Sequence, residues 1–205
     1  MKLQPSIPPF DQEATTVRTQ LPTKPALVVI GSTTFFHRDS AATCVAVGSL
    51  LALIEGLVLI TGGVTGIGEG VGRSFFDSRR KAGRAPEVFH VLPRGSAVRN
   101  YGVTLFAGSD MAERREVLAR LSRLNLALEG GPGTVHEGEV ALGRGAIVIP
   151  VGRSGGYAGK LYPALPRPAF APAASWQALG LSDITPNCVA KAVYEIVSNY
   201  LQLAA

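Results

Sequence analysis

Cysteine, charge and long apolar runs are all scarce in this chain of 205 residues. The two cysteines, Cys44 and Cys188, lie far apart in the sequence and outside any spacing typical of metal ligands. A chain without a disulfide framework fits a reducing compartment, so we expect a cytoplasmic or otherwise reducing location. No charged segment followed by an apolar one stands at the N-terminus, and we therefore expect that the protein is not secreted.

Uninterrupted apolar stretches are too short to cross a membrane. The longest apolar run, residues 45–60, is broken by two glycines, a serine and a glutamate, whereas a spanning helix needs about 20 predominantly apolar residues in a row. Charged residues make up only 17% of the chain and hydrophobic residues 46%, which excludes an intrinsically disordered chain. Length and composition therefore predict one compact domain with no membrane span.

Basic residues exceed acidic ones, which gives a net charge of +5, and 15 of the 20 basic residues are arginine. Arginine suits bidentate contacts with phosphate or carboxylate groups, although a compositional bias explains the excess equally well. The arginines do not gather in a basic segment with interleaved aromatic residues. We therefore expect a small phosphorylated ligand and do not expect nucleic acid as a partner.

Short, continuously apolar segments alternate with helical patterns along most of the chain. The expected strands cover residues 26–30, 57–61, 87–92, 103–106, 124–128 and 146–151. The expected helices cover residues 39–55, 66–82, 110–122, 134–143 and 185–203. This alternation predicts a single α/β domain of Rossmann-like type, a doubly wound parallel sheet with helices on both faces.

The beginning of the chain falls outside this alternation. Residues 1–25 are rich in Pro, Thr and Gln, and we expect an extended N-terminal arm there. The Rossmann-like nucleotide-binding domain is then expected to cover residues 26–205. Within it, residues 152–172 form a Gly/Pro-rich region between the last expected strand and the last expected helix.

Three of the expected strands end in glycine-rich turns. Ligands of such sheets bind beyond the carboxyl ends of the strands, and glycine lets the backbone approach a ligand closely. The following helix N-terminus adds free N–H groups and a positive dipole end, which suits phosphate. Tight strand-to-helix turns also need glycine, but three such turns at one edge favour a phosphate site. The candidate phosphate- or nucleotide-binding residues in these turns are Gly31, Ser32, Gly62, Gly63, Gly66, Gly130, Gly131, Gly133 and Thr134.

Two other nucleotide-binding motifs fit the sequence less well. Residues 61–68 match the TGxxxGIG turn of short-chain dehydrogenases, but there the turn follows the first strand, and here a strand and a helix precede it. Those enzymes also need a Tyr-x-x-x-Lys pair, whereas Tyr157 and Lys160 are one residue too close. A P-loop is absent because Leu161, rather than Ser or Thr, follows Lys160.

Two segments between residues 110 and 137 carry a more specific pattern. The run Asp110-Met-Ala-Glu-Arg-Arg115 begins a helix, and Glu129-Gly-Gly-Pro-Gly-Thr-Val-His-Glu137 joins the next strand to the next helix. They resemble the two signatures of the LOG (LONELY GUY) family, Asp-Met-His-Glu-Arg-Lys and Pro-Gly-Gly-x-Gly-Thr-x-x-Glu. The turn over residues 61–69 is similar to a third landmark of that family. The resemblance covers residues 26–151, and the region after it looks more like the wider SLOG superfamily, which includes nucleotide-sensing modules.

The resemblance implies hydrolysis of the N-glycosidic bond of a nucleoside 5′-monophosphate, which releases the base and ribose 5-phosphate. The catalytic arginine and glutamate of the family correspond to Arg114 and Glu137, and we add Arg115 to the phosphate-binding set. Cleavage builds oxocarbenium character on the ribose, so a carboxylate beside the sugar can stabilise it and orient water. The arginine can hold that carboxylate or the leaving base. A solvated helix face, with Glu113 and Glu116 as partners, is the alternative role of the two arginines.

The sequence departs from the LOG signatures at several positions. Glu129 replaces a proline and places an anion near the phosphate site, which is unfavourable unless an arginine neutralises it. Ala112 replaces a histidine. His136 replaces a glutamate, and we expect it to pack at the pocket edge rather than to bind a metal. The departures keep a second interpretation open, a SLOG-like module that holds a nucleotide or cofactor without turnover, alone or as a subunit of a larger assembly.

The resemblance also implies a homodimer in which helices of the partner help to line the pocket. The candidate apolar contacts on the helix after residue 110 are Met111, Val117, Leu118 and Leu121, unless these face the chain's own sheet. The expected ligand is a nucleoside monophosphate or a related phosphorylated molecule. We expect no separate cofactor and no metal ion at the site.

Overall fold

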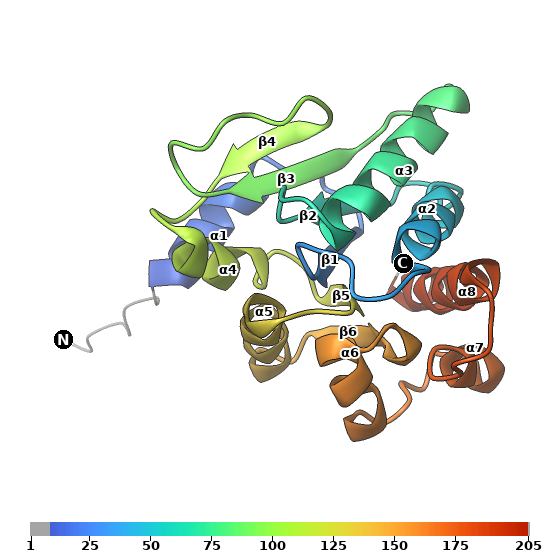
Figure 1. Cartoon of the computed structure of the whole chain (residues 1–205). Helices are drawn as coiled ribbons and strands as arrows, with labels where there is room; N and C mark the ends of the chain where they lie inside the picture. Colours follow the sequence, from blue (N-terminus) through green and yellow to red (C-terminus); the bar gives the residue numbers. More distant parts are fainter. Residues whose placement is uncertain (1–8, 205) are drawn as a thin grey trace.

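A computed structural model describes residues 9–204, which form an α/β domain around one sheet (Figure 1). The strands are β1 (Ala26–Gly31), β2 (Val58–Thr61), β3 (Val88–Leu92), β4 (Val103–Phe106), β5 (Leu124–Leu128) and β6 (Ile147–Val151). Neighbouring strands are all parallel, in the order β4-β3-β2-β1-β5-β6. The expected Rossmann-like, doubly wound parallel sheet is confirmed, and each expected strand is present.

Helices cover both faces of the sheet (Figure 1). They are α1 (Pro9–Arg18), α2 (Ser40–Leu51), α3 (Ile67–Lys81), α4 (Met111–Leu118), α5 (Pro132–Gly143), α6 (Gly156–Leu161), α7 (Ala173–Ala178) and α8 (Pro186–Ala204). Side chains of α2, α3, α7 and α8 join one core cluster, and side chains of α1, α4, α5 and α6 join the other. Strands β2, β3 and β5 are buried along their whole length, which is why they are rich in apolar side chains, whereas the edge strand β4 is largely exposed. No helix within residues 9–204 is long and apolar enough to cross a membrane.

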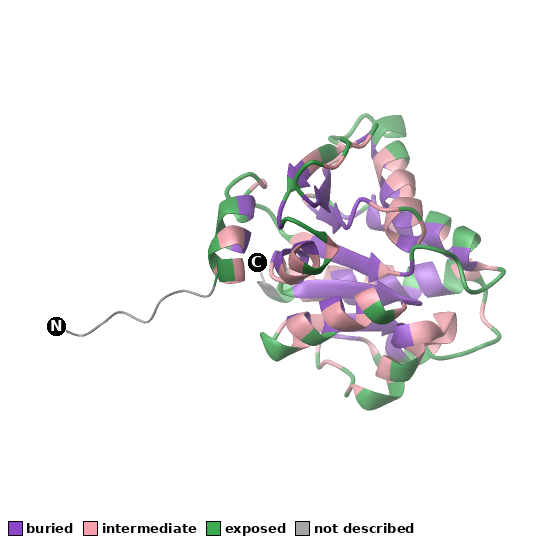
Figure 2. Ribbon diagram, turned by 60° about the vertical axis from the view of Figure 1, so that its left-hand side comes forward, coloured by how far each residue is buried: buried purple, intermediate pink, exposed green. Residues whose placement is uncertain are grey.

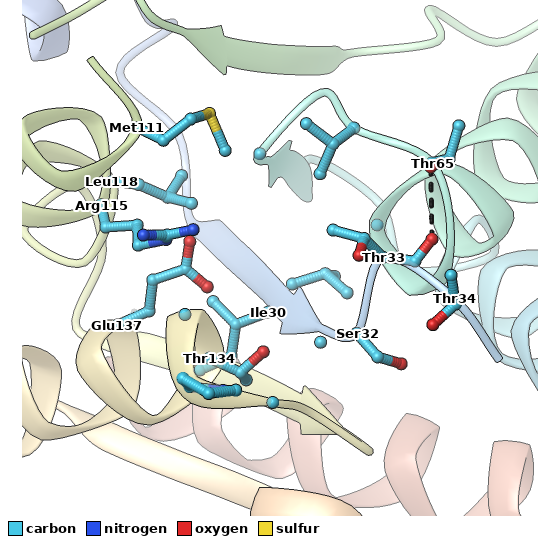
Figure 3. Close-up of a pocket in the computed structure, with 18 of the residues that line it drawn as sticks. Ile30, Ser32, Thr33, Thr34, Thr65, Met111, Arg115, Leu118, Thr134 and Glu137 are labelled. Atoms are coloured by element: carbon cyan, nitrogen blue, oxygen red, sulfur yellow. Dashed lines mark hydrogen bonds between the residues drawn. The ribbon is translucent and has the colours of Figure 1, made fainter. Parts of the chain in front are cut away.

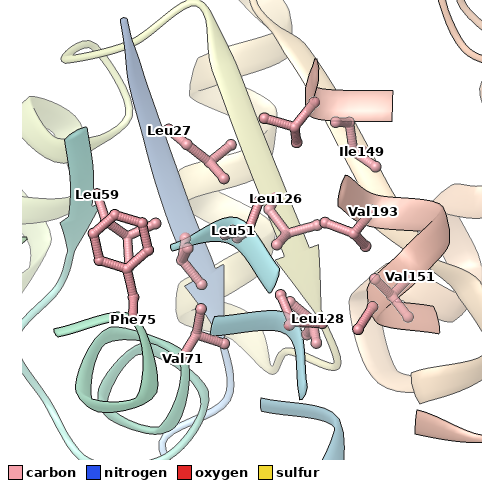
Figure 4. Close-up of a cluster of buried hydrophobic side chains, with 14 of the residues drawn as sticks. Leu27, Leu51, Leu59, Val71, Phe75, Leu126, Leu128, Ile149, Val151 and Val193 are labelled. Carbon is pink, nitrogen blue, oxygen red and sulfur yellow. The ribbon is translucent and has the colours of Figure 1, made fainter. Parts of the chain in front are cut away.

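The larger core cluster packs one face of the sheet against α2, α3, α7 and α8. Its side chains include Leu59 and Leu126 from the strands, and Leu51, Val71 and Phe75 from the covering helices (Figure 4). Figure 2 shows that buried residues concentrate in the strands and on the helix faces that meet them, whereas most loops are exposed. The loops at the strand ends are therefore held at their bases by packed strands while their tips stay accessible to a ligand.

The expectation of an extended N-terminal arm is wrong for its described part, because residues 9–18 form helix α1. This helix buries Ala14 and Val17 in the second core cluster. Asp11 forms ion pairs with Arg120 and Arg144, at 3.0 and 2.7 Å. A ten-residue helix of polar composition depends on such tertiary contacts rather than on intrinsic propensity, which is why the sequence pattern did not reveal it. Residues 1–8 of the expected arm lie outside the described part.

The Gly/Pro-rich region after β6 contains helix α6, which supports the turn between β5 and α5. The backbone N–H groups of Tyr157 and Ala158 donate to the carbonyl oxygens of Gly130 and Glu129, both at 2.9 Å. This short helix was not recognised in the sequence because glycines stand directly before it and at its start. These two hydrogen bonds fix the backbone of the β5–α5 turn, which is one of the turns that we expected to bind phosphate.

The apolar side of α4 faces the chain's own core rather than a second subunit. Val117, Leu118 and Leu121, which we expected as dimer contacts, are at most 4% exposed and belong to the second core cluster. Met111, the fourth expected contact, lines the cleft described below. The prediction of dimer contacts at Val117, Leu118 and Leu121 is therefore wrong, whereas the contact at Met111 and the homodimer itself stay predictions.

Candidate functional site

A cleft of about 280 Å³ opens at the carboxyl edge of the sheet, above the neighbouring strands β1 and β5. From β1 the chain continues to β2 on one side, and from β5 it continues to β6 on the other side. The loops that follow β1 and β5 therefore diverge and leave a crevice between them. Figure 3 shows two walls of the cleft, one from α4 and α5 and the other from the loops after β1 and β2. Sheets of this topology bind their ligands at this position.

Most of the predicted site residues line this cleft. They are Gly31, Ser32, Gly62, Arg114, Arg115, Gly131, Gly133, Thr134 and Glu137. Gly63, Gly66 and Gly130 do not line it, and they adopt positive φ angles that shape the turns. At Gly66, with φ of 91°, a Cβ atom would stand 2.2 Å from the carbonyl oxygen of Ser32, so this glycine lets two loops pack together.

Sequence reasoning missed part of the lining. Thr33, Thr34 and Thr65 add hydroxyl groups on the wall opposite α5 (Figure 3). The hydroxyl of Thr65 donates to the carbonyl oxygen of Thr33 at 3.2 Å and joins the two loops. All three threonines lie inside the glycine-rich turns, so their position in the sequence could have identified them as lining residues. The other missed lining residues are Val29, Ile30, Phe36, Val64, Gly68, Met111, Leu118 and Pro132.

Arg114 and Glu137 form a buried ion pair in the wall of the cleft. Nη1 of Arg114 donates to Oε1 of Glu137 at 2.8 Å, and the two side chains are 2% and 8% exposed. The Asp110 carboxylate caps α4 by accepting from two N–H groups of its first turn, which fixes the helix that carries Arg114. The guanidinium packs against Gly62, where a Cβ atom would stand 2.7 Å from Nη1. The pair therefore joins α4, α5 and the β2–α3 turn.

Each member of this ion pair depends on the other to keep its charge. Burial raises the pKa of the Glu137 carboxyl above its ordinary value, and the charges of Arg114 and Arg115 oppose that rise. Burial likewise lowers the pKa of the Arg114 guanidinium, and Glu137 opposes that change. Perturbed groups of this kind, gathered in a cleft, are typical of functional sites.

Arg115 presents a half-buried guanidinium to the cleft, and within residues 9–204 it has no hydrogen-bond or ion-pair partner. It lies over the first turn of α5, where a Cβ atom on Gly133 would stand 2.8 Å from Nε of Arg115. Pro132 has no N–H group, but Gly133 and Thr134 offer free N–H groups at this helix N-terminus. The guanidinium and the helix N-terminus thus converge on one place that suits an anion.

The carboxylate of Glu129 does not line the cleft. It is fully buried, and the residue has a φ of 54°. The hydroxyl groups of Ser32 and Ser40 donate to it, as do the backbone N–H groups of Phe36 and His37 at 3.1 and 3.3 Å. Neutral donors from the loop after β1 and from Ser40, the first residue of α2, compensate this charge in place of an arginine. The Ser32 hydroxyl is consequently directed to Glu129 and not to a ligand phosphate.

His136 lies outside the lining of the cleft and connects α5 to α4. Its Nε2 atom is 2.5 Å from Oε1 of Glu116. In the part of the chain that the structure describes, no group of three or more histidine, cysteine, aspartate or glutamate side chains is arranged to hold a metal ion. The sequence-based expectation of no metal and no separate cofactor stays a prediction.

Fold and cleft together define the class of the protein, a Rossmann-like α/β protein whose candidate ligand cleft lies where the strand order reverses. The model of the SLOG cluster4 family matches residues 24–164, which include every residue of the cleft lining. The chain therefore belongs to the SLOG cluster4 family, in agreement with the resemblance seen in its sequence. No curated protein matches the chain.

Several solved structures are similar to this one. TM1055, a structural genomics target, shares 26% identity over 69% of this chain and 82% of its own, with a TM-score of 0.57. The molybdenum cofactor binding protein of the phototrophic bacterium Rippkaea orientalis shares 26% identity over 62% and 76%, with a TM-score of 0.52. The molybdenum cofactor carrier protein of Chlamydomonas reinhardtii shares 24% over 61% and 74%, with a TM-score of 0.50, and this likeness concerns the fold alone.

Proposed function

We propose that the cleft binds a nucleotide or a nucleotide-derived cofactor by its phosphate group. The observation that carries this proposal is the guanidinium of Arg115, which lies above the N-terminus of α5 and has no ion-pair partner among the described residues. Arginine binds phosphate oxygens with two donors at once, and the N–H groups of Gly133 and Thr134 add further donors. Membership of the SLOG cluster4 family supports this ligand class. The similar Rippkaea orientalis protein, described as binding the molybdenum cofactor, supports a cofactor as one possible ligand.

As the reaction we propose hydrolysis of the N-glycosidic bond of a nucleoside 5′-monophosphate. With the phosphate at the start of α5, the ribose lies beside Glu137, one turn further along the same helix. The bond between C1′ and the base nitrogen breaks, the base keeps the electron pair, and positive charge develops on C1′ and the ring oxygen. The Glu137 carboxylate stabilises that charge and orients a water molecule. The water oxygen bonds to C1′ and one of its protons goes to the base, which leaves free base and ribose 5-phosphate.

A second candidate function is binding without turnover. The observation that favours it is the contact between Glu137 and Arg114, because a carboxylate already paired with a buried guanidinium has less charge to offer a developing cation. The chain would then act as a SLOG-like module that holds a nucleotide or cofactor, alone or within a larger assembly. The similarity to a molybdenum cofactor binding protein is in line with this alternative.

One experiment separates the two functions. The protein is incubated with a panel of nucleoside 5′-monophosphates, free base is measured by chromatography, and binding is measured by titration calorimetry. Release of base together with ribose 5-phosphate supports the hydrolase. Saturable binding without release supports the binding module. A panel that shows neither release nor binding contradicts both.

The Arg115→Ala variant is expected to bind AMP roughly ten- to one-hundredfold more weakly than the wild type, because it loses a charge-assisted contact with the phosphate. The measurement is calorimetric titration with AMP. Arg123→Ala is the matched control, since Arg123 is exposed, does not line the cleft and carries the same charge. Equal losses in the two variants would show that only the net charge matters and would contradict a phosphate contact at Arg115.

We also propose, from the resemblance to LOG proteins, that the protein is a homodimer in a reducing compartment. The free cysteines Cys44 and Cys188 support the choice of compartment. Light scattering at micromolar concentration is expected to give twice the chain mass of 21.4 kDa. A stable particle with the mass of one chain would contradict the dimer.

A further inference from the structure

Phe36 is a large apolar side chain at the rim of the cleft. It is the one aromatic residue in the lining, as far as residues 9–204 are concerned, and it is 55% exposed. An aromatic ring that is left this open forgoes much of the stabilisation that burial would provide. Its place at the rim of the cleft leaves the ring accessible to a ligand bound there.

The backbone at Phe36 is held in place by a buried charge. The Glu129 carboxylate accepts hydrogen bonds from the N–H groups of Phe36 and His37, and from the hydroxyls of Ser32 and Ser40. Burying a carboxylate is costly unless its hydrogen bonds are satisfied, and here they are satisfied by the loop that carries Phe36 together with Ser40, the first residue of α2. The loop is thus ordered before a ligand arrives, which lowers the entropic cost of binding.

The same turn that offers the phosphate site also determines the position of Phe36. Glu129 directly precedes Gly130, in the turn that leads into the N-terminus of α5. Val64 and Met111, from two other elements, add apolar surface to the lining. A ligand anchored by its phosphate at α5 therefore meets one open aromatic face and further apolar side chains within the same cleft.

We propose that Phe36 stacks on the planar ring of the ligand and thereby determines its specificity, an inference that rests on the proposed nucleotide binding. Aromatic side chains stack on nucleobases and on related fused heteroaromatic rings, whose flat faces present similar π surfaces. The ligands selected are then phosphorylated molecules that carry such a ring. Sugar phosphates that lack a heteroaromatic ring can use the phosphate site but gain nothing from Phe36.

Paired titrations with AMP and with ribose 5-phosphate test this inference. Both ligands are titrated calorimetrically into the wild type, Phe36→Ala, Phe36→Trp and Phe35→Ala, and chromatography after each run verifies that the AMP is intact. Phe35 is the matched control, because it is adjacent and 45% exposed but does not line the cleft. Phe36→Trp retains a flat aromatic face and distinguishes stacking from a general effect on the loop.

The expected result is that Phe36→Ala weakens AMP binding by roughly five- to one-hundredfold. Ribose 5-phosphate binding is expected to stay unchanged in all variants, and Phe36→Trp and Phe35→Ala should bind AMP like the wild type. Equal AMP affinities of Phe36→Ala and the wild type would overturn the stacking role, as would a parallel loss of ribose 5-phosphate binding. A wild type that binds neither ligand would overturn the proposed function itself, and the stacking role with it.

Discussion

Glu137→Gln is expected to reduce base release by roughly a hundredfold to a thousandfold while nucleotide affinity changes little. The amide keeps the shape of the carboxylate but removes the charge that stabilises the oxocarbenium ion. The phosphate contacts proposed at Gly133, Thr134 and Arg115 remain intact, so binding is largely preserved. The measurements are single-turnover rates of base release from the best nucleoside monophosphate and calorimetric affinities for the same ligand.

Glu139→Gln is the matched control for this variant. Glu139 is on the same helix and is exposed, so its replacement makes the same change of charge away from the cleft. We expect Glu139→Gln to release base at the wild-type rate. If Glu137→Gln also does so, Glu137 has only a structural role at the α4–α5 contact, and the hydrolytic mechanism proposed for it is wrong.

Arg114→Ala is expected to destabilise the protein by about 3–5 kcal/mol at neutral pH, because it leaves the Glu137 carboxylate buried without its cation. The same change removes the group that orients Glu137, so base release is expected to fall as well. Urea denaturation measures the free energy of unfolding. Arg114 is the one hydrogen-bond partner of the Glu137 side chain within residues 9–204, and its charge opposes the rise in the Glu137 pKa more than that of Arg115 does.

The loss of stability in Arg114→Ala is expected to depend on pH. Burial already raises the pKa of Glu137, and removal of the cation that opposes this effect raises the pKa further. A carboxyl whose folded-state pKa exceeds its unfolded-state pKa makes the folded state lose stability as pH rises through the interval between the two values. The deficit relative to the wild type should therefore be larger at pH 8 than at pH 5.

The double variant Arg114→Ala with Glu137→Gln is the control for this prediction. It lacks the titrating carboxyl, so its deficit should be smaller than that of Arg114→Ala at pH 8 and should lose the pH dependence. A deficit of Arg114→Ala that is the same at both pH values would show that lost packing of the arginine, rather than an uncompensated charge, causes the destabilisation.

The sheet and most of the loops of the cleft could be predicted from local patterns. A strand buried on both faces is predominantly apolar, so the segments at residues 26–30 and 124–128 were recognisable without any knowledge of their neighbours. Glycine-rich turns at the carboxyl ends of such strands indicated where a ligand binds. Helix α1 was missed because its ten residues depend on contacts with distant arginines, which leave no periodic signal in a short polar segment.

By itself, the sequence determined the parallel α/β architecture, the edge of the sheet that carries the cleft, and the residue types available there, because periodicity and turn chemistry are local properties. Only the tertiary structure decided which of these groups meet. It brought Arg114 to 2.8 Å from Glu137 across 23 positions of sequence, and it turned Ser32 toward Glu129 across 97 positions. It also directed the apolar side of α4 inward and placed the Arg115 guanidinium at the cleft, where no side chain of residues 9–204 pairs with it. Contacts of this kind depend on how packed elements orient their side chains, and no local pattern in the sequence contains that information.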